Sequence, residues 1–220
     1  MLRDEPIRSF KARRRVTAGQ AVALERLLPE YGIDLTVPFD PVAVYGRKAP
    51  LVLEIGSGMG EATAAMAAAD PARDLLAVEV HTPGVGSLLR RIESGGLTNV
   101  RVAEADAVQV LRTLLPSGGL DEVRVFFPDP WPKSRHGKRR LVSASFADLV
   151  ADRLCDGGRM HVTTDAQSYA DQALRVLADH PRLEVVSRDR GNRPVTRFEQ
   201  QALDAGRTSC DVVAVRRPAG

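Results

Sequence analysis

The sequence is poor in the features that mark disulfide-rich, zinc-binding, secreted and membrane proteins. Its 220 residues include only 2 cysteines, Cys155 and Cys210, and no CxxC or Cys/His spacing surrounds either of them. Neither a disulfide scaffold nor a structural zinc site is therefore indicated. The first residues, MLRDEPIRSF, lack the apolar segment of a signal peptide, and no apolar run is long enough to cross a bilayer. These absences predict a cytoplasmic protein with no membrane association.

A strong excess of one charge is also missing, since the net charge is only +3. The positive charge is nevertheless concentrated in two runs. Residues 8–15 and 133–140 contain five Lys/Arg each and no acid, which leaves 21 basic and 28 acidic residues elsewhere. A single short basic run is usually solvated surface. Two such runs on an otherwise acidic chain favour contact with a polyanion such as nucleic acid.

The hydrophobic pattern predicts one α/β domain behind a basic arm. Residues 1–40 are expected to form the arm and a short helix, and residues 41–220 the domain. The predicted apolar face of that helix consists of Ala21, Leu24, Leu27 and Leu28.

Five strand–helix units follow along the domain. Strands are predicted at 51–56, 75–80, 99–106, 122–129 and 159–165. Helices are predicted at 61–69, 85–94, 107–115, 143–154 and 166–180. The segments 182–189 and 210–217 are expected to form a final antiparallel pair, with no clear helix between them. This order predicts a doubly wound, Rossmann-like sheet.

The turn after the first predicted strand, GSGMGE, indicates which cofactor the domain suits. Gly56, Gly58 and Gly60 allow a ligand to approach the backbone closely, although a plain tight turn explains them equally well. The dinucleotide fingerprint G-x-G-x-x-G needs a small residue where Glu61 stands, and a carboxylate there repels a pyrophosphate. A cationic cofactor without phosphates fits better. S-adenosylmethionine carries an ammonium and a sulfonium and is such a cofactor.

Three carboxylates stand at the ends of the first three predicted strands. Glu54 lies beside the glycine turn. Glu79 ends the second strand, where a carboxylate can accept hydrogen bonds from both ribose hydroxyls. Asp106 ends the third strand, in a position to meet an adenine edge. Glu79 can alternatively be a surface acid and Asp106 a helix N-cap. Because open α/β sheets bind ligands at the carboxyl ends of their strands, the set favours cofactor binding.

The stretch FFPDPWPKSRHGKRR, residues 126–140, combines an Asp between two prolines, the only Trp and the second basic run. The prolines stiffen the segment and fix where Asp129 and Trp131 point. Asp129 can accept hydrogen bonds from a base or stabilise positive charge on a methylated ring, or it can cap the following turn. Trp131 can stack on a base or fill the core. Charge for phosphate contacts comes from Lys133, Arg135, His136, Lys138, Arg139 and Arg140.

These motifs resemble those of the bacterial tRNA (guanine-N7-)-methyltransferase family. FFPDPWPKSRHGKRR is the specific part, LEIGSGMGE lies upstream and TRFE (196–199) downstream, and the similarity runs from Ser9 to about Asp211. The resemblance implies a class I methyltransferase fold, with a seven-stranded, mostly parallel sheet, a C-terminal antiparallel hairpin and helices on both faces. It also implies methyl transfer from S-adenosylmethionine to guanine N7 in the variable region of tRNA, without a metal.

The resemblance further implies roles for individual residues. The cofactor-contacting positions correspond to Glu54, Glu79, Asp106 and Asp129, and Asp129 is also the implied active-site residue. The substrate-binding positions correspond to Lys133, Asp165, Thr196, Arg197, Phe198 and Glu199. The RNA-contacting stretch corresponds to Arg135, His136, Gly137, Lys138, Arg139 and Arg140.

Local structural roles compete with some of these assignments. Asp165 can cap the helix that follows it, and Thr196 and Glu199 have the spacing of a capping box. The sequence also departs from the family pattern, because Gln201 and Ala202 stand where an Arg and a Gly are usual. This departure bears on the geometry of that loop and leaves the glycine turn untouched.

Other functions explain part of the pattern. A methyltransferase acting on another RNA, a protein or a small molecule would keep the carboxylates and the glycines but would not need both basic runs. A non-catalytic RNA-binding protein would keep the basic runs and could lose the carboxylates. An NAD(P) oxidoreductase is opposed by Glu61. The four histidines form no metal-like cluster, and the sequence leaves the choice between monomer and homodimer open.

Overall fold

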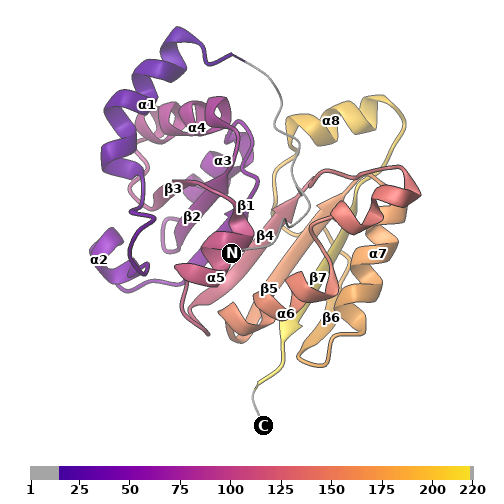
Figure 1. Cartoon of the computed structure of the whole chain (residues 1–220). Coiled ribbons are helices and arrows are strands. Elements are labelled where there is room, and N and C mark those ends of the chain that lie inside the picture. The colour runs from indigo at the N-terminus through magenta and orange to yellow at the C-terminus, as the bar shows by residue number, and fades with distance from the viewer. Residues whose placement is uncertain (1–14, 219–220) are drawn as a thin grey trace.

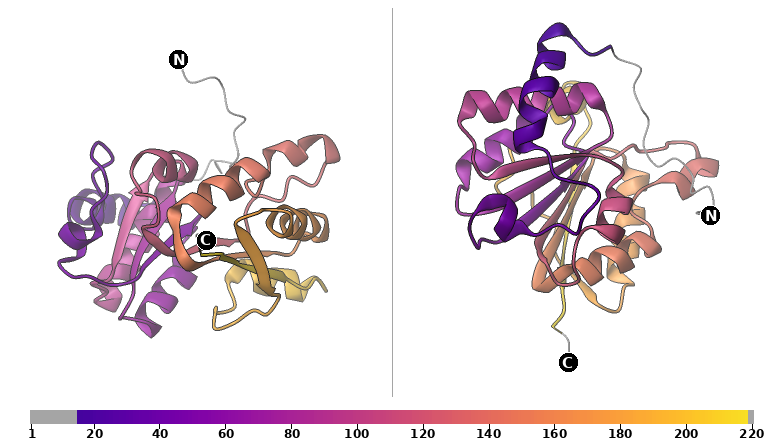
Figure 2. Two further views of the ribbon diagram at one scale, coloured as in Figure 1. Left: turned by 90° about the horizontal axis from the view of Figure 1, so that it is seen from below. Right: turned by 60° about the vertical axis from the view of Figure 1, so that its left-hand side comes forward.

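The computed structural model describes residues 15–218, without the side chains of Ser134, Arg197 and Phe198. The predicted basic run at 8–15 therefore lies outside the described residues except for Arg15. Within the described chain a seven-stranded sheet has the strand order β3-β2-β1-β4-β5-β7-β6. Helices pack on both faces of this twisted sheet (Figures 1 and 2). The predicted fold class is thus confirmed.

The elements have the following bounds. The strands are β1 (Leu51–Ile55), β2 (Asp74–Glu79), β3 (Val100–Glu104), β4 (Leu120–Phe126), β5 (Leu154–Thr164), β6 (Leu183–Ser187) and β7 (Cys210–Arg216). The helices are α1 (Ala18–Tyr31), α2 (Pro41–Tyr45), α3 (Glu61–Ala69), α4 (Thr82–Gly95), α5 (Ala107–Thr113), α6 (Ala144–Arg153), α7 (Gln167–Ala178) and α8 (Arg197–Asp204), with a 3₁₀ helix η1 (Ser134–Arg139). The strands β1 to β5 pair in parallel, and β7 is antiparallel to both β5 and β6.

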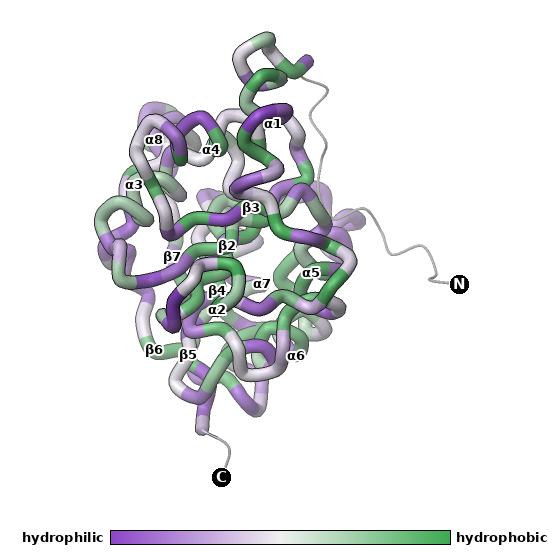
Figure 3. The backbone as a smooth tube through the Cα atoms, turned by 90° about the vertical axis from the view of Figure 1, so that its left-hand side faces the viewer, coloured by the Kyte–Doolittle hydropathy of each residue, from purple (hydrophilic) through white to green (hydrophobic). Residues whose placement is uncertain are grey.

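Two apolar cores hold the helices to the sheet. On one face α1, α3 and α4 pack over β1, β2 and β3 around Val52, Leu89 and Val102. On the other face α5, α6 and α7 pack around Leu53, Val125 and Phe146. In Figure 3 much of the tube at strands such as β2 has the colour of hydrophobic residues. All five residues of β1 are buried, which is the pattern expected of a central parallel strand covered on both sides.

The first of these faces is only partly covered by helices. Beyond α3, a polar hollow of ≈ 760 Å³ lies over β4, β5 and β7, next to the segment 186–194. Its floor carries alternating strand residues such as Arg124 and His161. Glu122 on β4 forms ion pairs with Arg73 and Arg124, so charges on this face are paired within the protein.

Several predicted strand boundaries were wrong. Strand β4 ends at Phe126, because Phe127 adopts a left-handed backbone with φ 49° and turns the chain away. Strand β5 begins at Leu154, so Gly157 and Gly158 lie within it and do not close the preceding helix. A register shift between β4 and β5 accompanies this start.

Short helices account for the other differences. No clear helix was predicted between the last two strands, yet α8 lies there; it is only 8 residues long and polar on average. The helix α2 begins at Pro41 behind an Asp40 cap. In α1 the expected face is partly wrong, since Ala21 is exposed while Ala23 and Leu27 are buried against α4.

In the described part of the chain, no helix is long and apolar enough to span a membrane.

We predict that Tyr169→Phe destabilises the protein. Tyr169 on α7 is fully buried, and its hydroxyl accepts a hydrogen bond from the backbone N–H of Val142 at 3.0 Å. Removing the hydroxyl leaves a buried donor unpaired, which costs about 1–3 kcal/mol. Chemical denaturation should show that loss in the free energy of unfolding, while Val186→Ala at an exposed site should show little. Equal stability of wild type and Tyr169→Phe would contradict the assignment.

Candidate active site

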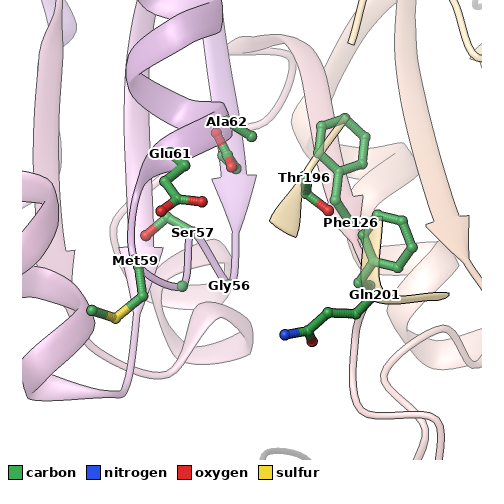
Figure 4. A pocket seen from close by; sticks show the side chains of 11 residues that line it. Gly56, Ser57, Met59, Glu61, Ala62, Phe126, Thr196 and Gln201 are labelled. Atoms are coloured by element: carbon green, nitrogen blue, oxygen red, sulfur yellow. The ribbon is translucent and has the colours of Figure 1, made fainter. Parts of the chain in front are cut away.

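Two neighbouring pockets lie at the carboxyl ends of β1, β2 and β4. The glycine-turn pocket has a volume of ≈ 200 Å³. One of its walls contains Glu54, Gly56, Ser57, Gly58, Met59, Glu61 and Ala62, and the facing wall contains Phe126, Phe127, Thr196 and Gln201 (Figure 4). The Glu79 pocket, of ≈ 90 Å³, is lined by residues that include Ile55, Gly56, Val78, Glu79, Asp106 and Leu141. The two pockets meet at Gly56, so they form one elongated site.

The glycine turn has the backbone that only glycine adopts readily. Gly56, Gly58 and Gly60 have φ angles of 77°, 56° and 76°. A Cβ atom at Gly60 would also lie 2.7 Å from a side-chain atom of Leu88 in α4. The turn therefore keeps its shape only with glycine at these positions, and the shape leaves room for a ligand beside the backbone.

Glu79 both fixes this turn and lines the second pocket. Its Oε2 accepts a hydrogen bond from the N–H of Gly58 at 2.8 Å. Its Oε1 accepts from the N–H groups of Val80 and His81 at 2.8 and 2.9 Å. Because each carboxylate oxygen has two lone pairs, Glu79 can hold the turn and still accept a hydrogen bond from a ligand hydroxyl.

Glu54 is an unusual carboxylate because it is only 3 % exposed and one of its oxygens has no partner among the described residues. The hydroxyl of Thr63 donates to Oε1 at 2.9 Å, whereas Oε2 is left over. Burial raises the pKa of Glu54 to about 7, and the opposing effect of Arg124 is smaller. The buried Oγ of Ser57 in the same wall is also unpartnered. The unpartnered carboxylate oxygen of Glu54 and hydroxyl of Ser57 together suit a ligand that carries both an ammonium and a carboxylate.

Asp106 is a helix N-cap, the role that the sequence analysis gave as an alternative to cofactor binding. Its Oδ1 accepts hydrogen bonds from the N–H groups of Val108 and Gln109 at 2.9 and 3.1 Å, and so caps α5. The same residue lines the Glu79 pocket. The cap holds Asp106 at the pocket, and its contact with a cofactor stays a prediction.

The segment after β4 has a strained backbone on both sides of Asp129. Phe127 and Trp131 have φ angles of 49° and 42°, which side chains rarely adopt. Phe127 lines the glycine-turn pocket, whereas Asp129 lines neither pocket and is half-buried. Trp131 is also half-buried, with the Arg139 guanidinium 5.0 Å from its ring centre and the His136 ring at 5.8 Å. It is thus neither a core side chain nor an open stacking platform.

The basic stretch divides into exposed and buried members. Lys133, Arg135 and Lys138 are exposed around η1, whereas Arg140 is only 7 % exposed. The Arg140 guanidinium donates to Pro130 O, Ser168 O, Ser168 Oγ and Gln172 Oε1 at 2.9–3.0 Å. In this structure the donors of Arg140 are used inside the protein, so its contact with RNA stays a prediction.

The TRFE segment forms the start of α8 and part of the pocket. Thr196 lines the glycine-turn pocket, and its hydroxyl accepts from the N–H of Glu199 at 3.0 Å. Glu199 is buried, and its carboxylate receives hydrogen bonds from Arg190, Arg193 and Ser209. These bonds anchor the start of α8, and direct contact of Glu199 with the substrate stays a prediction. The side chains of Arg197 and Phe198 lie outside those described.

Asp165 and Lys133 lie outside both pockets. Asp165 follows β5 and forms an ion pair with Arg207 at 3.1 Å. Lys133 is exposed at the start of η1. In the described part of the chain, no group of three or more His, Cys, Asp or Glu residues is placed to hold a metal ion.

The sequence did not identify the wall that faces the glycine turn. Phe126 and Phe127 were assigned to a strand end, and Gln201 was noted only as a departure from a family pattern. Their position in the sequence could have identified them, because they are next to segments that were already predicted to belong to the site. Ser57 was passed over because a Ser within a glycine turn has no distinctive spacing.

Comparison with solved structures supports the fold. The 16S rRNA methyltransferase KamB has a TM-score of 0.56 and 14% sequence identity, covering 82% of this chain and 95% of its own. A putative methyltransferase from Streptococcus mutans in complex with SAH has a TM-score of 0.53 and 12% identity, covering 77% of this chain and 89% of its own. These similarities show that the chain has the class I, Rossmann-like methyltransferase fold.

Comparison with sequence families is more specific. A family model described as "Putative methyltransferase" matches residues 48–212. The tRNA (guanine-N(7)-)-methyltransferase of Streptomyces avermitilis is 52% identical over 218 residues, covering 96% of this chain and 75% of the relative. The enzyme of the same name from Nitrosospira multiformis is 50% identical over 214 residues, covering 94% and 93%. The chain belongs to the tRNA (guanine-N7-)-methyltransferase family.

We predict that cofactor affinity depends on pH through Glu54. With a pKa of about 7 in the fold and 4.5 as its ordinary value, Glu54 retains a proton between these limits. The protonated form therefore stabilises the fold fully below about pH 4.5, and this contribution is lost as pH rises through about 7. A cationic ligand needs the ionised form, so affinity for S-adenosylmethionine should fall as pH drops below about 7.

Calorimetric titrations between about pH 6 and 8, about one unit on either side of the transition, test this linkage. The Glu54→Gln variant should bind more weakly, and its affinity should vary little with pH. The exposed Glu25→Gln variant on α1 should behave like wild type. A wild-type affinity that is independent of pH would contradict the assignment.

Proposed function

We propose that this protein transfers a methyl group from S-adenosylmethionine to N7 of a guanine in the variable region of tRNA, and that it does so in the cytoplasm. The observation that carries the proposal is its identity of 50% or more to relatives named tRNA (guanine-N(7)-)-methyltransferase over nearly the whole chain. The pockets and the exposed basic residues beside them supply the chemistry that such a reaction needs. The proposed cytoplasmic location follows from the tRNA substrate.

The geometry suits a reaction that needs positioning more than proton transfer. Guanine N7 carries a lone pair and no proton, so no general base is required. S-adenosylmethionine, when bound, supplies an electrophilic methyl group. Glu54 and the glycine turn would hold the charged amino-acid end of the cofactor, and Glu79 the ribose. The wall formed by Phe126 and Phe127 would then place the guanine for an in-line approach, which depends on alignment of the reacting atoms.

Asp129 is proposed to act on the guanine. It follows the pocket residue Phe127 by two positions, between two backbone turns that limit its movement. Methylation leaves positive charge on the ring, and a fixed carboxylate stabilises charge that develops in the transition state. The proposed function therefore assigns Asp129 the electrostatic part of catalysis.

The exposed residues Lys133, Arg135 and Lys138 are proposed to contact tRNA phosphates. They surround η1, which follows directly from the segment that carries Asp129. Phosphate contacts of this kind position a nucleic acid without reading its sequence. They would bring the variable region to the pockets and leave the choice of guanine to the pocket walls.

Methyl transfer from labelled S-adenosylmethionine into tRNA transcripts tests the proposed function. Label should enter a transcript with guanine in the variable region and should not enter one in which those guanines are replaced by adenine. Labelling of both transcripts would place the target elsewhere in tRNA. Labelling of neither, with the cofactor still bound, would point to another RNA, a protein or a small molecule as acceptor.

We predict that Asp129→Asn and Asp129→Ala lower turnover strongly. Loss of one fixed electrostatic group in an active site typically lowers kcat by about 100-fold or more. The fold should survive, because Asp129 is half-buried in a loop outside the two cores. Single-turnover assays with saturating cofactor, alongside circular dichroism, provide the measurement. Near-normal kcat in both variants would remove Asp129 from the mechanism.

We predict that Arg135→Glu combined with Lys138→Glu weakens tRNA binding and leaves cofactor affinity nearly unchanged. Two fewer phosphate contacts should reduce the slope of log K against log salt by about 2. Filter binding across a salt series measures this slope. The matched control is Lys48→Glu, because Lys48 is exposed before the amino end of β1, at the opposite edge of the sheet. Since the control changes half as much charge, an effect half as large in the control would show that only net charge matters.

A further inference from the structure

We infer that Arg193 is a positioning residue, which fixes the pocket wall formed by the end of β4 and the start of α8. Its side chain is only 2 % exposed and joins three segments that are separate in the sequence. These segments are the end of β4, the helix α8 and the strand β7. The effect on turnover rests on the proposed function, whereas the effect on geometry does not.

The Arg193 guanidinium makes paired hydrogen bonds to two carboxylates. Nη1 and Nη2 donate to Oε2 and Oε1 of Glu199 at 2.6 and 3.0 Å. Nε and Nη2 donate to Oδ1 and Oδ2 of Asp211 at 2.8 and 2.9 Å. Such two-pronged bonds fix orientation as well as distance, which a lysine ammonium does not do. Arg193 therefore sets the position of α8, through Glu199, relative to β7.

Both carboxylates are held in the ionised form. Burial alone would raise the pKa of Asp211, but hydrogen bonds from Arg193, His161 and Thr163 hold it well below its usual value. The pKa of Glu199 is likewise lowered, because Arg193 and Ser209 outweigh its burial. The network is a fixed charge arrangement around Arg193 at neutral pH, so it resists movement.

The faces of the same guanidinium contact the end of β4. Its carbon lies 5.9 Å from the ring centre of Phe126 and 5.6 Å from that of Phe127. The backbone of Phe127 is left-handed, a conformation that is unfavourable for a residue with a side chain. The Arg193 guanidinium next to the Phe127 ring helps to stabilise this conformation. Asp129 follows two residues later, so Arg193 acts on the direction of that segment.

Arg193 consequently controls one wall of the glycine-turn pocket. Four residues of this wall depend on Arg193. Its guanidinium lies next to the rings of Phe126 and Phe127. Thr196 and Gln201 belong to the segment that Arg193 anchors through Glu199. The facing wall comes from β1 and α3, and the Glu79 pocket from β1, β2 and α5. Its loss should therefore shift the substrate side of the site and leave the cofactor carboxylates in place.

Arg193→Lys tests this inference, because it keeps the positive charge between the two carboxylates and removes the paired bonds. Cofactor affinity should stay nearly unchanged, whereas kcat should fall by about 100-fold, the size expected from a displacement of about 1 Å. Trp131 is the only Trp and lies in the displaced segment, so acrylamide should quench its fluorescence more strongly in the free variant. Arg190→Lys is the matched control, since Arg190 also bonds Glu199 and is partly exposed. It should leave all three quantities near wild type.

Three results would overturn the inference: wild-type kcat in Arg193→Lys, a loss of cofactor affinity equal to the loss of kcat, or unchanged quenching of Trp131. If Arg193→Lys does not fold, Asp211→Asn replaces it, with smaller changes expected in the same direction and the same results counting against it. If wild type transfers no methyl group to tRNA, the proposed function fails. Trp131 quenching and cofactor affinity then still decide whether Arg193 fixes this segment.

Discussion

The parallel pairing of β1 with both β2 and β4 is the constraint on which the rest of the site depends. Glu54 on β1 lies opposite Ala77 on β2 and Arg124 on β4, so the three strands end at the same edge of the sheet. The glycine turn follows the end of β1, Glu79 is the last residue of β2, and the Phe126–Phe127 wall lies at the end of β4. One hydrogen-bonding pattern thus collects residues that are distant in the sequence and leaves a gap between them for ligands.

The charged residues at this edge of the sheet have different roles. Glu79 accepts hydrogen bonds from the backbone N–H groups of Gly58 and Val80, and Glu199 and Asp211 are paired with Arg193. Glu54 alone among these four has an unpartnered buried oxygen. A cation is therefore favoured at one place, next to the glycine turn. The exposed basic residues around η1 lie outside the pockets, where they can meet a polyanion without competing for that position.

The sequence predicted well the parts whose signal is local. Continuous apolar runs predicted the parallel strands. The turn was predicted from Gly56 and Gly60, which adopt the positive φ angles that other residues rarely adopt. The helix α8 was missed because it is only 8 residues long and its mostly polar residues resemble those of a loop. The inward position of Arg140 was not predicted either, because it depends on tertiary hydrogen bonds. A run of basic residues does not show which member is turned inward toward Pro130 and Ser168.

The most direct test of the central claim compares methyl transfer into two tRNA transcripts that differ in one atom. One carries guanine in the variable region and the other carries 7-deazaguanine, in which N7 is replaced by carbon. If the site positions the N7 lone pair against the methyl group of S-adenosylmethionine, label enters the first transcript and does not enter the second. Equal labelling of both transcripts would contradict the account, because methylation would then occur at another atom.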